Sequence, residues 1–263
     1  MIHLKVLNGK NTVSIDQGEL ISYKIDGEEF IHQKGSPGWR NSDTEMFPVI
    51  GPTAENNFIV PSPKGDSFQD QHGILREMPY QLIRSDSVTA VFEKKYKANT
   101  PLLNSKYPDK SSIEKVSWPY DFCFQKSFSL SENDLHIEFA IESEKGMPFM
   151  LGYHPAFLLS EKNLIEANGQ KISFPEIMAG GSKAFPVLDC QKIILRKEPG
   201  SSLKISTVGF GHFMLWTEVN NMLCIEPITR YPYVGNMNFE ENMFQISKGR
   251  EHFSVLIEAI GPI

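Results

Sequence analysis

Apolar residues alternate with polar ones along much of this sequence, which is the pattern of half-buried β-strands. The segment LHIEFAIE places four apolar side chains on one face, those of Leu135, Ile137, Phe139 and Ile141. The helical pattern, with apolar residues three and four positions apart over ten or more residues, is nowhere convincing. We therefore expect an all-β chain.

A hairpin is predicted by the segment LISYKIDGEEFIH, with Ile21, Tyr23 and Ile25 on one face. Asp26-Gly27 forms its turn, because these residue types accept positive φ angles. Turn-forming residues separate further strand candidates, which are VTAVFEKKY, QKSFSL, QKIILR, LKISTV, HFMLW, MLCIE and HFSVLIEAI. Strands at this density favour a mainly antiparallel sandwich or barrel-like fold.

The chain has 263 residues, a length that all-β folds often reach as one domain. Two stretches, 61–70 and 98–112, are predicted to be long loops. Neither has the composition of a linker between two cores, and no internal repeat is visible. We therefore expect a single domain over residues 1–263.

The net charge of −6 argues against a nucleic-acid partner, because phosphate backbones are bound by basic surfaces. No segment has the length and hydropathy of a signal peptide or a membrane span, so we expect a cytoplasmic protein without a membrane partner. The three cysteines, Cys123, Cys190 and Cys224, are widely spaced and are expected to be buried free thiols.

Three segments are built around polar residues rather than around a core: QDQHGILRE (69–77), FMLGYHPAF (149–157) and LCIEPITRYP (223–232). His154 and Glu226 are each followed by proline, which favours an extended conformation before it and removes a ladder donor. We expect both side chains at strand exits. Because His72, His154 and Glu226 are far apart in the sequence, any meeting between them must be tertiary.

A histidine and a glutamate at strand exits suit paired acid and base catalysis near neutral pH. The residues themselves leave two structural alternatives open, a hydrogen-bonded core histidine and a strand-end glutamate in a salt bridge. His136 and Glu138 share a strand face, but no third metal ligand can be identified. Lys94, Lys95 and Lys97 are interpreted as a solvated strand edge.

Several of these segments together resemble the aldose 1-epimerase (galactose mutarotase-like) family. They are GELISYKIDGEEFIH, FPVIG (47–51), QHGILRE, GYHPAF and CIEP, in this order and at these separations. The resemblance extends from about residue 10 to the strand after Lys248-Gly249, and it is strongest to the shorter, less characterised branch of the family.

This resemblance implies a mainly antiparallel β-supersandwich whose concave face holds a free sugar. It also implies an aldose 1-epimerase (mutarotase) activity, which interconverts the α and β anomers by opening and closing the ring. Glu226 would then be the catalytic base, His154 the acid, and His72 a sugar-binding residue. No metal, nucleotide or other cofactor is implied.

Two further residues are candidates for sugar binding. Trp216 matches a family position that often holds an aromatic ring near the sugar, and a core tryptophan is the alternative. Arg76 could donate hydrogen bonds to sugar hydroxyls, or it could pair with Glu77 or another acid. Trp39 and Trp118 are expected to serve core or loop packing.

One departure from the family pattern concerns Pro52, which stands where an arginine usually contacts the sugar. Arg40, Arg76 or Asn56 would have to replace that contact. A sugar-contacting aspartate of the family has Asp189 as its nearest counterpart. The departure motivates one alternative, a carbohydrate-binding protein without turnover. A hexose-6-phosphate epimerase, as in a related branch, is a further alternative, which the overall acidity and the missing arginine at position 52 weaken.

The substrate sugar and the oligomeric state are not determined by the sequence. A glycoside hydrolase is disfavoured, because that chemistry uses two carboxylates and only Glu226 stands out. If the epimerase interpretation holds, His154 and Glu226 must converge on one sugar ring, which we expect them to approach from opposite edges.

Overall fold

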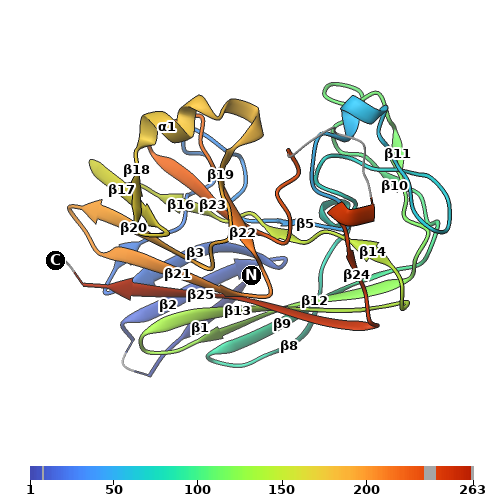
Figure 1. The fold of residues 1–263 in the computed structure, drawn as a ribbon. Coiled ribbons are helices and arrows are strands. Elements are labelled where there is room, and N and C mark those ends of the chain that lie inside the picture. Colours follow the sequence, from blue (N-terminus) through green and yellow to red (C-terminus); the bar gives the residue numbers. More distant parts are fainter. Residues whose placement is uncertain (8, 234–240, 262–263) are drawn as a thin grey trace.

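The computed structural model describes residues 1–7, 9–233 and 241–261. Its largest sheet has nine antiparallel strands, which form the lower layer in Figure 1. Their order is β18 (Gln170–Ile172), β17 (Lys162–Ala167), β20 (Lys192–Glu198), β21 (Ser202–Val208), β25 (Arg250–Ile260), β13 (Asp134–Ser143), β12 (Phe122–Leu130), β9 (Thr89–Tyr96) and β8 (Gln81–Ser85).

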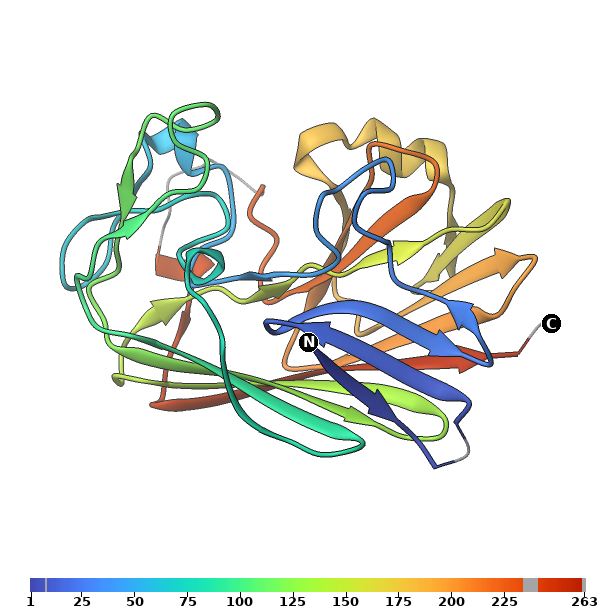
Figure 2. The same ribbon diagram turned by 180° about the vertical axis from the view of Figure 1, so that it is seen from behind.

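A six-stranded sheet lies above the large one in Figure 1. Its order is β19 (Phe185–Val187), β22 (His212–Trp216), β23 (Met222–Ile228), β15 (Gly152–Tyr153) and β5 (Glu45–Met46), with β16 (Ala156–Leu158) also paired to β23. The N-terminal strands form a four-stranded sheet of β1 (Ile2–Lys5), β2 (Asn11–Asp16), β3 (Glu19–Ile25) and β4 (Glu28–Glu29). Figure 2 shows this sheet in front when the molecule is seen from behind.

The remaining elements are short. Three strand pairs are β6 (Ile59–Val60) with β7 (Ser67–Phe68), β10 (Leu102–Leu103) with β11 (Lys115–Val116), and β14 (Pro148–Phe149) with β24 (Gln245–Ile246). The helical elements are α1 (Phe174–Ala179) and the 3₁₀ turns η1 (Thr53–Asn56), η2 (Leu75–Glu77), η3 (Gly181–Lys183) and η4 (Glu241–Met243). No helix among the described residues is long and apolar enough to cross a membrane.

The predicted alternation is confirmed where it was clearest. All four apolar residues of LHIEFAIE are fully buried in β13. From the same face, the ring of Phe139 lies 5.2 Å from that of Tyr153, so the large and the six-stranded sheets share one core. The seven further strand candidates all lie in strands, and the two predicted loops contain only the two-residue strands β7 and β10.

The predicted hairpin is formed by β3 and β4, and both turn residues, Asp26 and Gly27, have positive φ angles. The predicted face is only partly correct, because Leu20 and Tyr23 are the fully buried residues of β3. The pairing of β2 with β3 shifts register between Ser14 and Ile15, and this irregularity interrupts the strict alternation.

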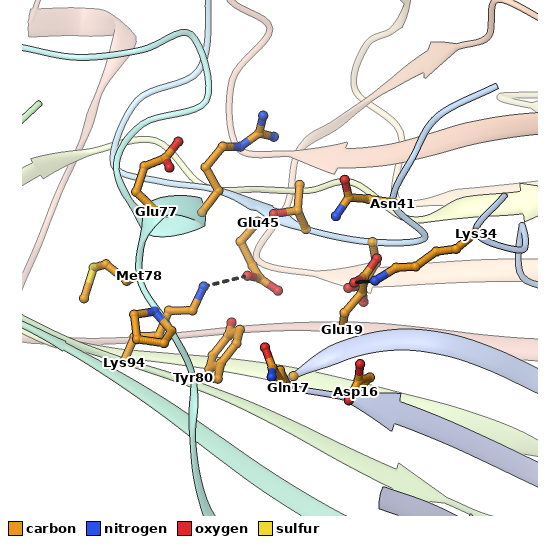
Figure 3. Close-up of a pocket in the computed structure, with 15 residues that line it drawn as sticks. Asp16, Gln17, Glu19, Lys34, Asn41, Glu45, Glu77, Met78, Tyr80 and Lys94 are labelled. Atoms are coloured by element: carbon orange, nitrogen blue, oxygen red, sulfur yellow. Dashed lines mark ion pairs between the residues drawn. The ribbon is translucent and has the colours of Figure 1, made fainter. Parts of the chain in front are cut away.

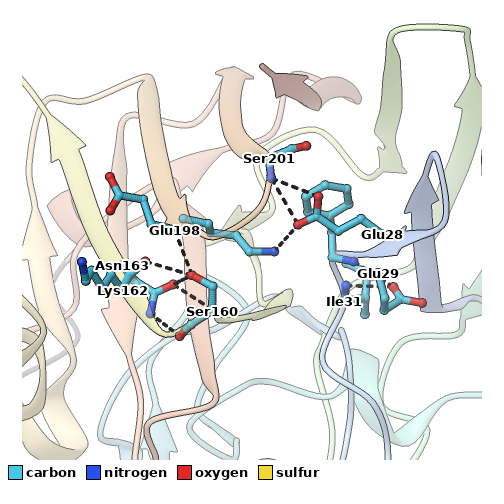
Figure 4. A network of polar contacts seen from close by, with 10 residues as sticks. Glu28, Glu29, Ile31, Ser160, Lys162, Asn163, Glu198 and Ser201 are labelled. Atoms are coloured by element: carbon cyan, nitrogen blue, oxygen red, sulfur yellow. Dashed lines mark hydrogen bonds and ion pairs between the residues drawn. The ribbon is translucent and has the colours of Figure 1, made fainter. Parts of the chain in front are cut away.

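A polar contact joins the N-terminal sheet to the large one, as Figure 4 shows. Lys197 Nζ lies 3.0 Å from Glu28 Oε1, and the backbone N–H of Ser201 donates to the same carboxylate. Lys197 is buried, so its charge requires this partner. The contact fixes the tip of the hairpin against β20.

The interpretation of the lysines in VFEKKYKA is wrong for one of them. Strand β9 lies between β8 and β12, and the Lys94 side chain is 5% exposed, with Nζ donating to the Leu75 carbonyl at 2.8 Å. Lys95 and Lys97 are exposed and pair with Glu93 and Asp121. The alternation of side chains along the chain therefore puts Lys94 on the opposite face from Lys95 and Lys97.

Candidate active site

His154 and Glu226 are brought together by strand register. Antiparallel pairing sets Gly152 opposite Ile228 and Ala156 opposite Cys224, so His154 falls directly opposite Glu226. His154 Nε2 lies 3.4 Å from Glu226 Oε1. The residues are 7% and 2% exposed, so the pair is buried but not sealed from solvent.

The backbone around His154 is held on its other side by the end of β5. The N–H of His154 donates to the carbonyl of Thr44 at 2.8 Å, and the N–H of Thr44 donates back at 3.3 Å. Pro155 provides no donor to continue the ladder. The chain therefore presents the imidazole at the junction of β15 and β16.

His72 enters the same site from the loop before η2. Its ring centroid lies 5.9 Å from that of His154, in an edge-to-face arrangement. The adjacent Gly73 has φ +69°, and a Cβ atom there would lie 2.1 Å from the Phe47 carbonyl oxygen. Only glycine permits this approach, which sets His72 beside the strands of the six-stranded sheet.

Trp39 is a member of the site that the sequence analysis did not identify. Its ring centroid lies 4.3 Å from that of His154, with the planes 34° apart. The backbone N–H of Trp39 donates to Met222 Sδ, and His32 Nε2 lies 2.8 Å from the Trp39 carbonyl oxygen. The ring also packs against the cluster of Ala156, Met222 and Cys224. The expectation of loop packing therefore holds for Trp39, which in addition contacts the imidazole. In the sequence, Trp39 could have been identified as a site candidate because it is a large ring within the loop GSPGWRNSD, away from any strand.

The other two tryptophans are placed as follows. Trp216 is half-buried opposite Cys224 on β22, and its ring lies 6.2 Å from that of His154. Trp118 is fully buried in the core, as expected. His154 is thus flanked by Trp39 and Trp216.

Arg76 lies on η2, and its guanidinium group is available for a ligand. Its Nε and Nη2 atoms are buried, and neither has a hydrogen-bond partner among the described residues. The alternative partner, Glu77, accepts hydrogen bonds from Ser105 instead. The positive charge of Arg76 acts on His72, His154 and Glu226, so it lies close enough to influence all three.

Burial controls the protonation of the candidate pair. Desolvation raises the pKa of Glu226 to about 8, although the charge of Arg76 opposes the change. Desolvation, assisted by Arg76, lowers the pKa of His154 to about 3. At neutral pH the imidazole is therefore neutral, and the one titratable proton of the pair resides on the carboxyl group. An acid and a base are in direct contact.

A polar cavity of about 390 Å³ adjoins this site, and Arg76 contributes to its wall (Figure 3). Glu45, Tyr80 and Lys94 also line it, and Lys94 Nζ lies 3.9 Å from both Glu45 Oε2 and the Tyr80 ring centroid. His154 and Glu226 do not line the cavity. Arg76 is therefore the link between the cavity and the acid–base pair.

Buried ionic contacts support this cavity from below. Lys126 Nζ lies 2.7 Å from both Asp43 Oδ2 and Glu45 Oε1, and the Tyr153 hydroxyl donates to the same Asp43 oxygen. Lys126 and Asp43 are almost completely buried. Because each charge is paired, the network fixes β5 against the large sheet.

The expected replacements for the arginine absent at Pro52 differ in their placement. Asn56 Nδ2 donates to the Ile59 carbonyl at 2.7 Å, and Arg40 is exposed. Arg76 is the candidate near His154 and Glu226 whose Nε and Nη2 donors have no hydrogen-bond acceptor among the described residues. Asp189 is exposed, and its Oδ1 lies 3.8 Å from His212 Nδ1.

One group among the described residues has the side chains for a metal ion, namely His154, Cys224 and Glu226, whose ligand atoms all lie within 4.8 Å of one another. The pair considered from the sequence, His136 and Glu138, belongs to no such group in the described part of the chain. All three cysteines are free thiols, and Cys190 and Cys224 are buried.

Comparisons with known proteins agree with this architecture. A family model described as aldose 1-epimerase matches residues 18–190. The chromosomal LacX protein of Lactococcus lactis subsp. lactis is 26% identical over 212 residues, which cover 74% of this chain and 64% of that protein. The chain thus matches slightly less than two thirds of the length of this curated relative.

Two solved structures share the fold over nearly their whole length. A galactose mutarotase related enzyme from Lactobacillus acidophilus gives a TM-score of 0.77 at 17% identity, with 99% of this chain and 98% of that chain covered. A galactose mutarotase-like protein from Lactobacillus casei gives 0.76 at 16% identity, with 99% and 100% covered. The expected mainly antiparallel, galactose mutarotase-like fold is confirmed.

Proposed function

The chain belongs to the aldose 1-epimerase family, and from this premise we propose that it interconverts the α and β anomers of a free aldose. The reaction opens the hemiacetal ring, allows rotation about the bond between C1 and C2, and closes the ring on the other face. It requires a proton to leave the anomeric hydroxyl and a proton to reach the ring oxygen. Side chains can perform both transfers.

The observation that carries the proposal is the 3.4 Å contact between His154 and Glu226. The anomeric hydroxyl and the ring oxygen are bonded to the same carbon, so the two groups that serve them should be neighbours. The expected approach from opposite edges of the ring is therefore replaced by an approach from one side. With the carboxyl group protonated and the imidazole neutral, the pair can act as acid and base in one step.

The protonation of the pair before reaction decides which of His154 and Glu226 acts as the acid and which as the base. The resemblance assigns the base to Glu226 and the acid to His154, whereas burial leaves the proton on Glu226. We propose that Glu226 protonates the ring oxygen while His154 accepts the hydroxyl proton. Ring closure then returns both protons and restores the starting pair.

The surrounding side chains fit a sugar between them. The half-buried rings of Trp39 and Trp216 offer apolar faces that can pack against the C–H faces of a pyranose. Arg76 and His72 have buried nitrogen atoms without hydrogen-bond partners among the described residues, and these atoms can form hydrogen bonds with sugar hydroxyls. We propose these four residues as the sugar-binding set, with Arg76 supplying the contact that Pro52 cannot.

The experiment is exchange NMR on α-glucose and α-galactose with the unmodified protein and two variants. Glu226→Gln and His154→Asn should each lower the protein-catalysed rate about a hundredfold or more, because each removes one proton-transfer group. Glu138→Gln and His136→Asn make the same chemical changes on β13 and should leave the rate unchanged. Rates insensitive to the first two variants would refute these roles.

A carbohydrate-binding protein without turnover is the second candidate, and the proline at position 52 favours it. Saturable binding of a sugar with no anomer exchange above the solvent rate would establish it. A parallel titration with glucose 6-phosphate tests the hexose-6-phosphate alternative, since tighter binding of the phosphate would support that substrate class.

A further inference from the structure

We infer that His154, Cys224 and Glu226 form a site for a thiophilic divalent cation, Zn²⁺, and that an ion bound there blocks the acid–base pair. The inhibitory effect rests on the proposed function, whereas the binding does not. Cys224 is the new element, because the acid–base reaction makes no use of its thiol.

Strand register places the three ligands on one face. Cys224 and Glu226 are two positions apart on β23, so their side chains point to the same side. Cys224 pairs with Ala156, and His154 lies two positions before Ala156. The three ligand atoms consequently lie within 4.8 Å of one another.

The spacing of two ligands already suits a tetrahedral ion. Zinc bonds of about 2.0–2.1 Å to nitrogen and oxygen give a tetrahedral edge of about 3.3–3.4 Å. The distance from His154 Nε2 to Glu226 Oε1 is 3.4 Å. The Cys224 sulfur lies within 4.8 Å of both atoms, so it is the candidate for the third corner.

The donor set selects a metal that accepts sulfur, nitrogen and oxygen together. Thiolate and imidazole exclude Mg²⁺ and Ca²⁺, which require oxygen ligands, and favour Zn²⁺. Ala156, Met222 and Cys224 form a small apolar cluster against which Trp39 and Trp216 pack. This apolar surrounding limits competition from water.

The ligands offset the charge of the ion. Cys224 and Glu226 bind a metal ion as a thiolate and a carboxylate, so their two negative charges balance the two positive charges of Zn²⁺. With His154 and Glu226 both on the metal, neither can transfer a proton to or from a sugar.

The test uses Cd²⁺ as a spectroscopic probe in a Cys123→Ser/Cys190→Ser variant, which retains Cys224 as its one cysteine out of three. We expect an ultraviolet sulfur-to-cadmium charge-transfer band that saturates at one ion per chain and is removed by Zn²⁺. Adding His154→Gln or Glu226→Gln to this background should weaken Cd²⁺ binding at least tenfold.

Two results would overturn the site. One is the absence of the band at saturating Cd²⁺. The other is an affinity unaffected by both added substitutions, which would show a thiol acting alone. If the double variant does not fold, the difference spectrum between the unmodified protein and Cys224→Ser gives the same comparison.

Anomer exchange measured with Zn²⁺ and then with added chelator tests the inhibitory half. We expect Zn²⁺ to stop exchange and the chelator to restore it, and exchange that continues with the site occupied would refute the inhibition. A chain that shows the cadmium band and no anomer exchange under any condition retains the metal site and refutes the proposed function, so the two failures are distinguishable.

Discussion

His154 Nε2 lies 3.4 Å from Glu226 Oε1, although the two residues are 72 positions apart in the sequence. The contact follows from the pairing of β15 and β16 with β23, which sets the two residues directly opposite each other. Because both are buried, Glu226 is protonated and His154 is neutral at neutral pH, so the titratable proton of the pair resides on the carboxyl group. The first two predictions below follow from that proton.

We expect anomer exchange to fall as the pH rises through about 8, where Glu226 loses its proton and the pair has no acid left. Between about pH 5 and about pH 7 the rate should be flat, because the pKa of His154 is about 3. Exchange NMR with subtraction of the solvent rate measures this profile. Arg76→Met should move the alkaline limb to higher pH, since the Arg76 charge lowers the Glu226 pKa. A rate that still rises above about pH 9 would contradict the assignment.

Glu226→Gln should be more stable than the unmodified protein at alkaline pH. The folded-state pKa of Glu226 is raised from 4.5 to about 8, so stability falls as the pH rises between these values, where this residue is ionised in the unfolded chain but still protonated in the folded one. Glutamine removes that loss. We expect the difference in unfolding free energy to grow by a few kcal/mol between about pH 5 and about pH 9. Urea denaturation at both pH values measures it, and a constant difference would refute the pKa.

Trp39→Ala should slow anomer exchange about tenfold or more, because the ring stacked on His154 fixes the imidazole. Trp39 is half-buried in a loop, so the unfolding free energy should change far less than for a core tryptophan such as Trp118. Trp39→Phe keeps a ring and should restore much of the rate. Equal rates for all three proteins would show that Trp39 does not position His154.

Gly73→Ala should destabilise the protein severely and displace His72. A Cβ atom would lie 2.1 Å from the Phe47 carbonyl oxygen, and the φ of +69° disfavours any other residue. Gly27→Ala is the matched control, with φ +86° and nothing within 4 Å of the added atom. It should cost only about 1–2 kcal/mol, the backbone term alone. Thermal unfolding compares the two, and similar melting temperatures would argue against the close approach at Gly73.

Lys126→Met should cost about 3–5 kcal/mol, because it leaves the buried Asp43 and Glu45 carboxylates without their shared partner. Lys204→Met also removes a lysine 2.7 Å from a carboxylate, that of Glu258, but both of those side chains are about 30% exposed. That change should cost about 0–1 kcal/mol. Denaturant titration measures both, and a small loss for Lys126→Met would indicate that water reaches the network.

The strands were predictable because a period of two is a local property. Each strand candidate and the Asp26-Gly27 turn depend on neighbouring residues only, and the structure confirms them. The alternation misled only where register intervened. It did so in β3. The error at Lys94 had another origin, because this residue was assigned to a solvated edge together with Lys95 and Lys97 before its neighbouring strands were known.

The site was less predictable from the residues themselves. Proline after His154 and Glu226 predicted strand exits for both, which is correct for His154 after β15 and wrong for Glu226, because β23 continues to Ile228. The roles of His72 and Trp216 came from the family resemblance. Trp39 belongs to an irregular loop, where no periodicity indicates the direction of a side chain. Asp189 was the nearest counterpart in the sequence, and the structure places it on the surface beside His212.

The sequence by itself determined that the chain is built of antiparallel strands and which side chains are of a type that can transfer protons, because side-chain type and alternation are properties of the chain. Only the tertiary structure decided that His154 opposes Glu226, that Trp39 covers the imidazole and that Cys224 lies beside both. The reason is that register joins strands distant in sequence. The protonation of the pair was likewise decided by burial, which is a property of the folded molecule alone.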